Sequence, residues 1–201
     1  MTDRWPLESL VGSVRALLEE LESRFQIDVV LQGAVSCHPG CTNCCHWPVA
    51  ASPLEGLIIL DHLKHNRMWS KAVQNKLRAS ADQVTGLAYH VWRAANIPCP
   101  LLKDGKCIVW EARPMACRVA ASRGDPDECH PHQLATASGL IPFAEVIVEF
   151  RSREAALLRS QDIRIRTLPL ATAVLVAAQI RDAGIDMMPY LTLNEYFRRA
   201  V

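Results

Sequence analysis

The sequence predicts a mainly α-helical protein: an irregular helical domain with a cysteine-rich loop region and one short β-hairpin around a metal site. Three observations lead to this prediction. Apolar residues recur at helical spacing in long segments, capping boxes mark helix starts, and eight cysteines are spread over the middle of a chain of 201 residues. A chain of this length suits one domain with a substantial hydrophobic core. We therefore expect a single domain over residues 1–201.

The first expected helix runs from about Pro6 to Phe25. Its apolar residues form one stripe at helical spacing, and proline suits the first helical position. The stripe consists of Leu7, Leu10, Val11, Val14, Leu17, Leu18, Leu21 and Phe25. This helix belongs to an expected scaffold of residues 1–36 and 130–201, which flanks a cysteine-cluster region of about 37–129.

Two further helices are expected between the cysteine groups. A capping box at Ser52–Glu55, with proline in the first helical position, starts one of them, and we expect Glu55 to act as a cap. The other runs from about Ser70 to Ala95, with Gly86 as its weak point. Because a short turn between the two makes an antiparallel helical hairpin, we expect Cys99 to return near Cys45.

A β-hairpin is expected around Asp104-Gly105, a turn signal between two apolar segments. A two-residue turn would pair Cys107 with Leu102 and point Cys99 to the other face of the hairpin. A three-residue loop would pair Cys107 with Leu101 and place both thiols on one face. Metal binding by both cysteines favours the three-residue loop, which is our prediction.

The C-terminal part is expected to be helical scaffold. Residues from Pro142 to about Leu158 are predicted to form a helix. Leu168–Ile180 is apolar nearly all round, as in a helix buried in a core. Thr192–Glu195 forms another capping box and predicts a short final helix.

Composition and charge favour a cytoplasmic protein. The formal net charge is +1, so no overall field favours nucleic acid or a membrane surface. The N-terminus lacks the basic start and apolar stretch of a signal peptide, and the longest apolar run is too short to span a bilayer. We therefore expect no nucleic acid and no membrane among the partners.

The eight cysteines predict a metal site. A reducing cytosol disfavours disulfides, and free core cysteines would not crowd four into the nine residues from 37 to 45. Thiolates separated by two or three residues on a tight turn can reach one centre, and zinc and iron–sulfur clusters prefer thiolate ligands. The expected ligands are Cys37, Cys41, Cys44, Cys45, Cys99, Cys107, Cys117 and Cys129.

The division of these thiols between centres stays open. Sequence order suggests one group from Cys37 to Cys45 and another from Cys99 to Cys129. Pointing the adjacent pair Cys44-Cys45 at one metal strains the backbone, which favours two centres or one multinuclear centre. The folded site could also interleave the two groups.

The ordered motifs of this region resemble the YkgJ-type cysteine-cluster family, which is described as a zinc- or iron-chelating domain. The motifs are Cys37-x3-Cys41-x2-Cys44-Cys45, Cys99-Pro100-x-Leu102, Gly105-x-Cys107-Ile108 and Arg113-Pro114-x2-Cys117-Arg118. The resemblance covers about half the chain and implies metal binding. Thr42-Asn43 and Trp110 depart from the residues common in the family, but neither departure removes a ligand.

An iron–sulfur cluster, of the 4Fe–4S type, is the expected cofactor, with zinc as the alternative. A tight three-cysteine turn completed by distant cysteines suits a cubane cluster, and Cys99-Pro100 is similar to the Cys-Pro of ferredoxins. Paired Cys-x2-Cys knuckles would favour zinc, but only Cys41 and Cys44 have that spacing.

Three functions are compatible with such a site. The first is an iron–sulfur protein with a redox or cofactor-dependent role, and the second is a structural zinc module that mediates protein interaction. The third is a protein-modifying enzyme, because flagellin lysine-N-methylases share a similar cysteine cluster. The sequence does not decide whether the protein is an enzyme and identifies no catalytic residue. A protein partner or protein substrate is expected.

Arg113 and Arg118 flank Cys117 and are the candidate cofactor-binding residues. Their guanidinium groups could offset thiolate charge or bind an anion, whereas Arg113 could instead hold the turn before Pro114. Histidines beside the cysteines could ligate a metal or donate a hydrogen bond to a thiolate, and they rank below the thiols. They are His38, His46, His130 and His132.

Overall fold

The computed structural model describes residues 7–33, 35–38, 40–129, 143–159 and 166–182. Within these ranges the chain forms seven α-helices and two short two-stranded sheets. The predicted mainly α-helical fold is therefore confirmed. No helix in the described part of the chain has the length and apolar character needed to cross a membrane.

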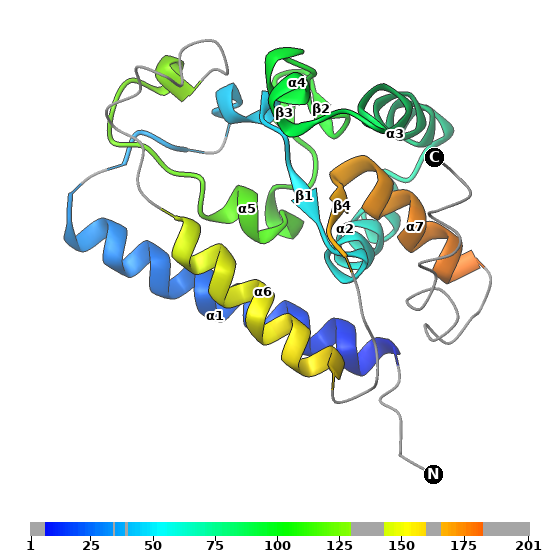
Figure 1. The fold of residues 1–201 in the computed structure, drawn as a ribbon, viewed down its shortest axis with the longest axis horizontal. Helices are drawn as coiled ribbons and strands as arrows, with labels where there is room; N and C mark the ends of the chain where they lie inside the picture. The colour runs from blue at the N-terminus through cyan, green and yellow to red at the C-terminus, as the bar shows by residue number, and fades with distance from the viewer. Residues whose placement is uncertain (1–6, 34, 39, 130–142, 160–165, 183–201) are drawn as a thin grey trace.

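Helices α1 (Leu7–Leu31) and α6 (Ala144–Arg159) lie side by side along one edge of the molecule (Figure 1). The first helix continues past its predicted end at Phe25, since Val29 also packs into the core. The helix predicted near Pro142 begins two residues later. Some predictions fall outside the described residues, namely those on Thr192–Glu195, His130 and His132.

Helices α2 (Pro53–His65) and α7 (Leu170–Asp182) pack so closely that their backbones almost touch. A Cβ atom at Gly56 would lie 2.3 Å from the carbonyl oxygen of Ala173, so only glycine fits there. Most side chains of α7 are buried. The prediction of a buried core helix within Leu168–Ile180 is confirmed.

The start of α2 is held by a short strand pairing and a cap. Strand β1 (Ala50–Ala51) pairs antiparallel with β4 (Leu168–Pro169), which leads directly into α7. The predicted capping box is present. The Ser52 hydroxyl accepts the backbone N–H of Glu55 at 3.1 Å, and the Glu55 carboxylate accepts that of Ser52 at 2.7 Å. The chain leaving the first cysteine group is thus fixed against the core.

The prediction of one helix from Ser70 to Ala95 is wrong, because the chain breaks at Gly86. Helix α3 (Lys71–Val84) ends just before this residue, and α4 (Tyr89–Ala94) begins after it. Gly86 has a φ of +77°, a left-handed conformation that glycine adopts without steric cost. The break directs α4 towards the cysteine region, at the top of the view in Figure 1.

The predicted β-hairpin forms, but with the other register. Strand β2 (Leu102–Lys103) pairs with β3 (Lys106–Cys107), and Leu102 lies opposite Cys107. The two turn residues have φ values of +50° and +68°, as in a two-residue turn of the type favoured by Asp-Gly. The prediction of a three-residue loop is therefore wrong.

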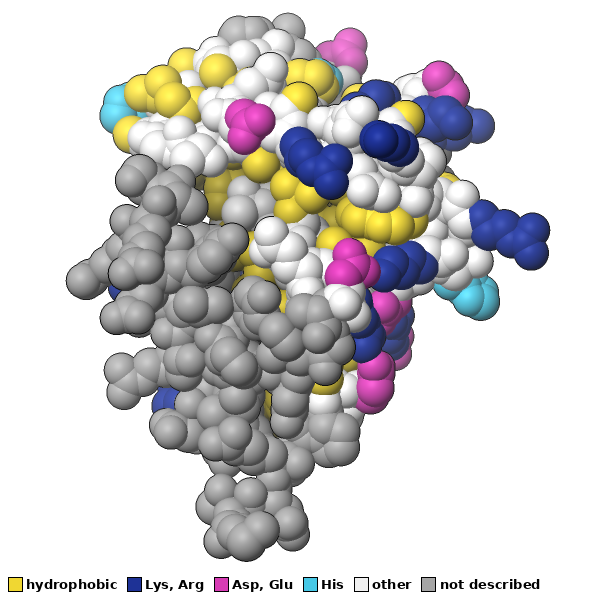
Figure 2. Space-filling model, turned by 90° about the vertical axis from the view of Figure 1, so that its right-hand side faces the viewer, with side chains coloured by type: hydrophobic (Ala, Val, Ile, Leu, Met, Phe, Trp, Pro, Cys, Tyr) yellow, Lys and Arg dark blue, Asp and Glu magenta, His cyan; other side chains and the backbone are white. Residues whose placement is uncertain are grey.

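The surface carries charges of both signs. On the face seen in Figure 2, basic and acidic side chains alternate along one edge, with hydrophobic side chains between them. The described residues on this face present no extended region of a single charge. This arrangement agrees with a formal net charge of +1.

Candidate metal centre

The first cysteines lie on a tight turn followed by the short 3-10 helix η1 (Asn43–His46). The Cys41 N–H donates to the His38 carbonyl at 3.0 Å, and the Cys45 N–H donates to the Thr42 carbonyl at 2.9 Å. These consecutive turns fold the chain tightly. As a result, the last three cysteines of this motif line one cavity.

Cys99 lies beside Cys45, as predicted, because the Cys99 N–H donates to the Cys45 carbonyl at 2.7 Å. A turn follows, in which the Leu102 N–H donates to the Cys99 carbonyl at 3.0 Å. Cys99 is therefore not part of the strand, and the alternation of side chains along a strand does not apply to it. Cys99 and Cys107 line the same cavity despite the two-residue turn.

Cys117 is carried by α5 (Met115–Arg118), whose start is fixed by Glu55. The Met115 N–H donates to Oε1 of Glu55 at 2.8 Å, while the same carboxylate caps α2. Arg151 of α6 reaches Oε2 of Glu55 at 2.6 Å. The predicted capping role of Glu55 is confirmed, and one buried carboxylate joins three helices beneath Cys117.

A second buried carboxylate, Glu154, completes this network. One of its oxygens accepts the Ser52 hydroxyl at 2.5 Å, and the other accepts Arg151 at 3.0 Å. Two carboxylates therefore share one guanidinium group. Burial and the negative charge of Glu55 raise the pKa of Glu154 to about 7.

We expect the Glu154→Gln substitution to remove a pH dependence of stability. The folded wild-type protein binds the proton of the Glu154 carboxyl group more tightly than the unfolded chain does. In the unfolded chain the pKa of Glu154 is near its ordinary value of 4.5. The free energy of unfolding contributed by Glu154 is therefore fully present below about pH 4.5 and is lost, by roughly 1–3 kcal/mol, as the pH rises through 7. Urea titrations between pH 5 and 8 measure this fall.

Glu149→Gln is the matched control, because Glu149 is an exposed carboxylate on the same helix. Its ion pair with Arg24 lowers its pKa, so it stays ionised above pH 5 and its loss should preserve the wild-type pH slope. Equal slopes in wild type and Glu154→Gln would contradict the prediction.

Cys129 lies with the first cysteine group. The segment η3 (Pro126–Cys129) contacts η1. The Asn43 amide donates to the Pro126 carbonyl at 2.7 Å, and the Trp47 indole N–H donates to the Cys129 carbonyl at 2.6 Å. Grouping by sequence order is therefore wrong for Cys129, and the fold interleaves the two groups.

Ser122 joins Cys37 to Cys129. Its backbone N–H donates to Sγ of Cys37 at 3.3 Å, and its hydroxyl hydrogen-bonds the Cys129 thiol. Only 1% of this serine is exposed. Hydrogen bonds to ligand sulfur tune metal centres, so Ser122 belongs to the candidate site. No local signal in the sequence points to this residue.

The cysteines other than Cys45 form two sets, and the charge of Cys44 acts on members of both. In one set, burial raises the pKa of Cys117 well above its ordinary value, and the charges of the other members raise it further. In the other set, burial raises the pKa of Cys129 to about 11, and neighbouring thiolate charges add to the effect. We call these the inner and outer thiols. The inner thiols are Cys44, Cys99, Cys107 and Cys117, and the outer thiols are Cys37, Cys41 and Cys129.

Six cysteines line one cavity. The volume in which the centre of a water-sized group can lie inside it is about 70 Å³. A single water needs only about 10–15 Å³ by that measure. Among the described residues, no three cysteine, histidine or acidic side chains converge closely enough to hold one ion. The six are Cys41, Cys44, Cys45, Cys99, Cys107 and Cys117.

The two candidate arginines are placed differently. Arg113 lines the cavity, and its positive charge acts to lower the pKa of Cys117 against the effect of burial. Its guanidinium lies 3.6 Å from the ring centroid of Trp110. The guanidinium of Arg118 instead donates to Glu22 and to two backbone carbonyls. This geometry favours Arg113 for offsetting thiolate charge and Arg118 for holding the loop.

Comparison with known proteins identifies one family. The model of the family described as "CxxCxxCC: Putative zinc- or iron-chelating domain" matches residues 36–136, half of the chain. No curated protein and no solved structure matches the chain. The matched stretch contains all eight cysteines, which supports metal binding by the cysteine cluster as a whole.

Proposed function

This chain belongs to the CxxCxxCC family of zinc- or iron-chelating domains, and we propose that it holds a 4Fe–4S iron–sulfur cluster with a redox or cofactor-dependent role. One observation carries the proposal: six cysteines line one cavity, more than the four ligands of a single zinc ion. A zinc ion takes four ligands at about 2.0–2.3 Å from one centre. An iron–sulfur cluster spreads its thiolate ligands over several irons, which suits thiols arranged around a space.

The donor chemistry fits such a cluster. Soft thiolates are its preferred ligands, and a bound cluster supplies one-electron transfer or an iron that can bind another molecule. Arg113 would offset part of the negative charge of the ligated thiolates, and Glu55 would hold α5 and Cys117 in place. The inner thiols would hold the cluster, namely Cys44, Cys99, Cys107 and Cys117.

The outer thiols would serve a second centre. Cys45 would complete the outer set, so that the eight cysteines divide into two sets of four. The adjacent thiols Cys44 and Cys45 then need not point at one metal. Ser122 would then tune the second centre through its contacts with Cys37 and Cys129. A cytoplasmic location is part of the proposal, because eight free cysteines persist best in a reducing compartment.

Elemental analysis of protein purified without oxygen tests the proposal. We expect iron with matching acid-labile sulfide, about four irons per chain for one cluster and about eight for two. We also expect a brown chromophore with visible absorption. Stoichiometric zinc in colourless protein would overturn the cluster.

A structural zinc module that mediates protein interaction is the second candidate. The observation in its favour is an exposed apolar surface on the last turns of α1, shortly before the first cysteine. Ile27, Val30 and Leu31 are 61%, 69% and 80% exposed there, and clustered apolar exposure of this kind marks interaction surfaces. In this alternative the metal would hold the loops and a protein partner would cover α1.

A further inference from the structure

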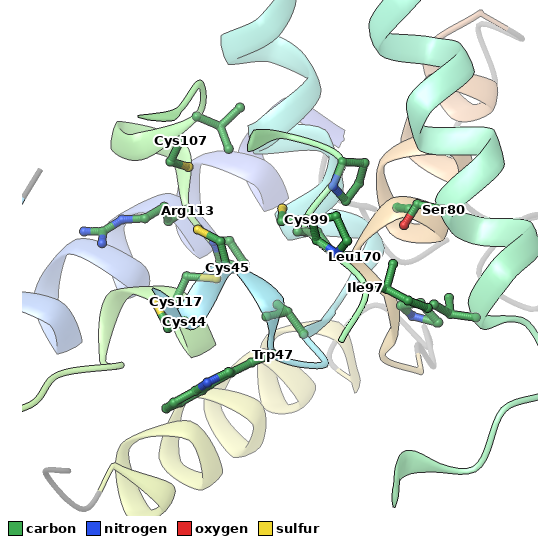
Figure 3. A pocket seen from close by; sticks show the side chains of 18 of the residues that line it. Cys44, Cys45, Trp47, Ser80, Ile97, Cys99, Cys107, Arg113, Cys117 and Leu170 are labelled. Atoms are coloured by element: carbon green, nitrogen blue, oxygen red, sulfur yellow. The ribbon is translucent and has the colours of Figure 1, made fainter. Parts of the chain in front are cut away.

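The cavity has a second end that carries no cysteine. Figure 3 shows Cys44, Cys45 and Cys117 on one side of the pocket and Ser80, Ile97 and Leu170 on the opposite side, with Cys99 between the two groups. This lining comes from the helices α3, α4 and α7 and from the segment before Cys99. We call it the apolar end, and its residues are Ser80, Val84, Trp92, Ile97, Pro98 and Leu170.

The apolar end has no charged side chain. Arg113 is the one charged residue among the described residues that line the cavity, and its guanidinium extends away from this end (Figure 3). Its Nε donates to the Trp110 carbonyl at 2.9 Å, and its Nη2 lies 3.4 Å from Glu22. A charged ligand would lose hydration at the apolar end without gaining a partner. An uncharged ligand has no such cost.

Indole rings flank the cavity at three places. Trp47, Trp92 and Trp110, three of the five tryptophans, line it, and each is only half-buried. Faces and edges of indole rings bind flat aromatic groups by stacking or edge-to-face contact. The break at Gly86 directs α4 and its Trp92 towards the thiols, so this part of the fold contributes directly to the cavity.

We propose that the apolar end binds an uncharged, flat aromatic molecule, or the aromatic part of a larger one, beside the metal centre. The inference deepens the proposed function, since it names the ligand class of the cysteine site. Binding itself rests on the cavity walls and not on the kind of metal. Among the described residues of this end, Ser80 provides the one hydroxyl, and it can orient a ligand through a single hydrogen bond.

Titration with 2-naphthol, an uncharged aromatic probe, tests the inference on the full chain purified without oxygen. We expect saturable quenching of tryptophan fluorescence, and binding of naphthalene-2-sulfonate at least about tenfold weaker because its charge finds no partner. Ser80→Phe, which fills the apolar end, and Trp92→Ala, which removes a ring, should each weaken 2-naphthol binding by about tenfold. Leu31→Ser, on the exposed surface of α1, should not change it.

Two results would overturn the inference. One is 2-naphthol binding that Ser80→Phe and Trp92→Ala leave unchanged, and the other is equal affinity for the sulfonate. Circular dichroism and metal content are measured on the same samples, so each variant is compared at equal folding and loading. Zinc protein that binds the probe would refute the iron–sulfur cluster alone, whereas iron–sulfur protein that does not bind it would refute the ligand site alone.

Discussion

Replacement of Gly56 by alanine is expected to lower the free energy of unfolding by about 3 kcal/mol or more. The added Cβ would lie 2.3 Å from the carbonyl oxygen and 2.7 Å from the carbonyl carbon of Ala173. Both are backbone atoms of α7, so no side-chain rotation relieves the overlap, and the two central helices must separate. Urea unfolding followed by circular dichroism measures the effect.

Gly12→Ala provides the control for helix propensity. Gly12 lies in α1, and a Cβ atom there meets nothing within 4 Å. Alanine should therefore stabilise the protein by about 0.5–1 kcal/mol, the usual gain in a helix interior. A Gly56→Ala variant that behaves like Gly12→Ala would contradict the close backbone packing of α2 on α7.

Replacement of Cys117 by serine is expected to remove the iron held by the inner thiols, because changes to second-shell groups alone can lower metal affinity at least about tenfold. Cys117 lies on α5 among the inner thiols, and burial and thiolate charge act on it together. A serine hydroxyl is a poor substitute for a soft thiolate ligand. Iron, sulfide and visible absorption of protein purified without oxygen measure the loss.

Cys37→Ser is the matched comparison, because Cys37 is an outer thiol and does not line the cavity. If the sets bind separately, this variant keeps the inner centre, loses no more than about half of the iron, and remains coloured. Complete loss of iron from Cys37→Ser would show that the eight cysteines serve one multinuclear centre.

Local signals in the sequence predicted much of the fold. The cap at Ser52 and Glu55 depends on residues three apart, and the buried helix α7 depends on one apolar segment. The break at Gly86 was not predictable in this way, because a single glycine costs a helix only about 1 kcal/mol. Whether a helix continues past such a residue depends on tertiary contacts, and these are not readable from a local pattern.

The candidate ligands could be predicted from their spacing, but their arrangement could not. Cys129 joins the first group through contacts of η3 with Asn43 and Trp47, which are more than eighty residues away. Ser122 enters the site through the same kind of distant contact. Cys99 and Cys107 would need the three-residue loop to share a face only if Cys99 belonged to a strand, and Cys99 lies in a turn.

The buried carboxylate of Glu55 has a consequence for the autonomy of the cysteine motif. The residues shared with the family end at 136, yet the guanidinium that neutralises Glu55 belongs to Arg151, beyond that limit. A peptide excised at the family boundaries would keep this carboxylate without its cation, a loss that costs about 3–5 kcal/mol for a buried pair. We therefore expect that the motif in this chain is not a portable module and needs α6 in order to fold.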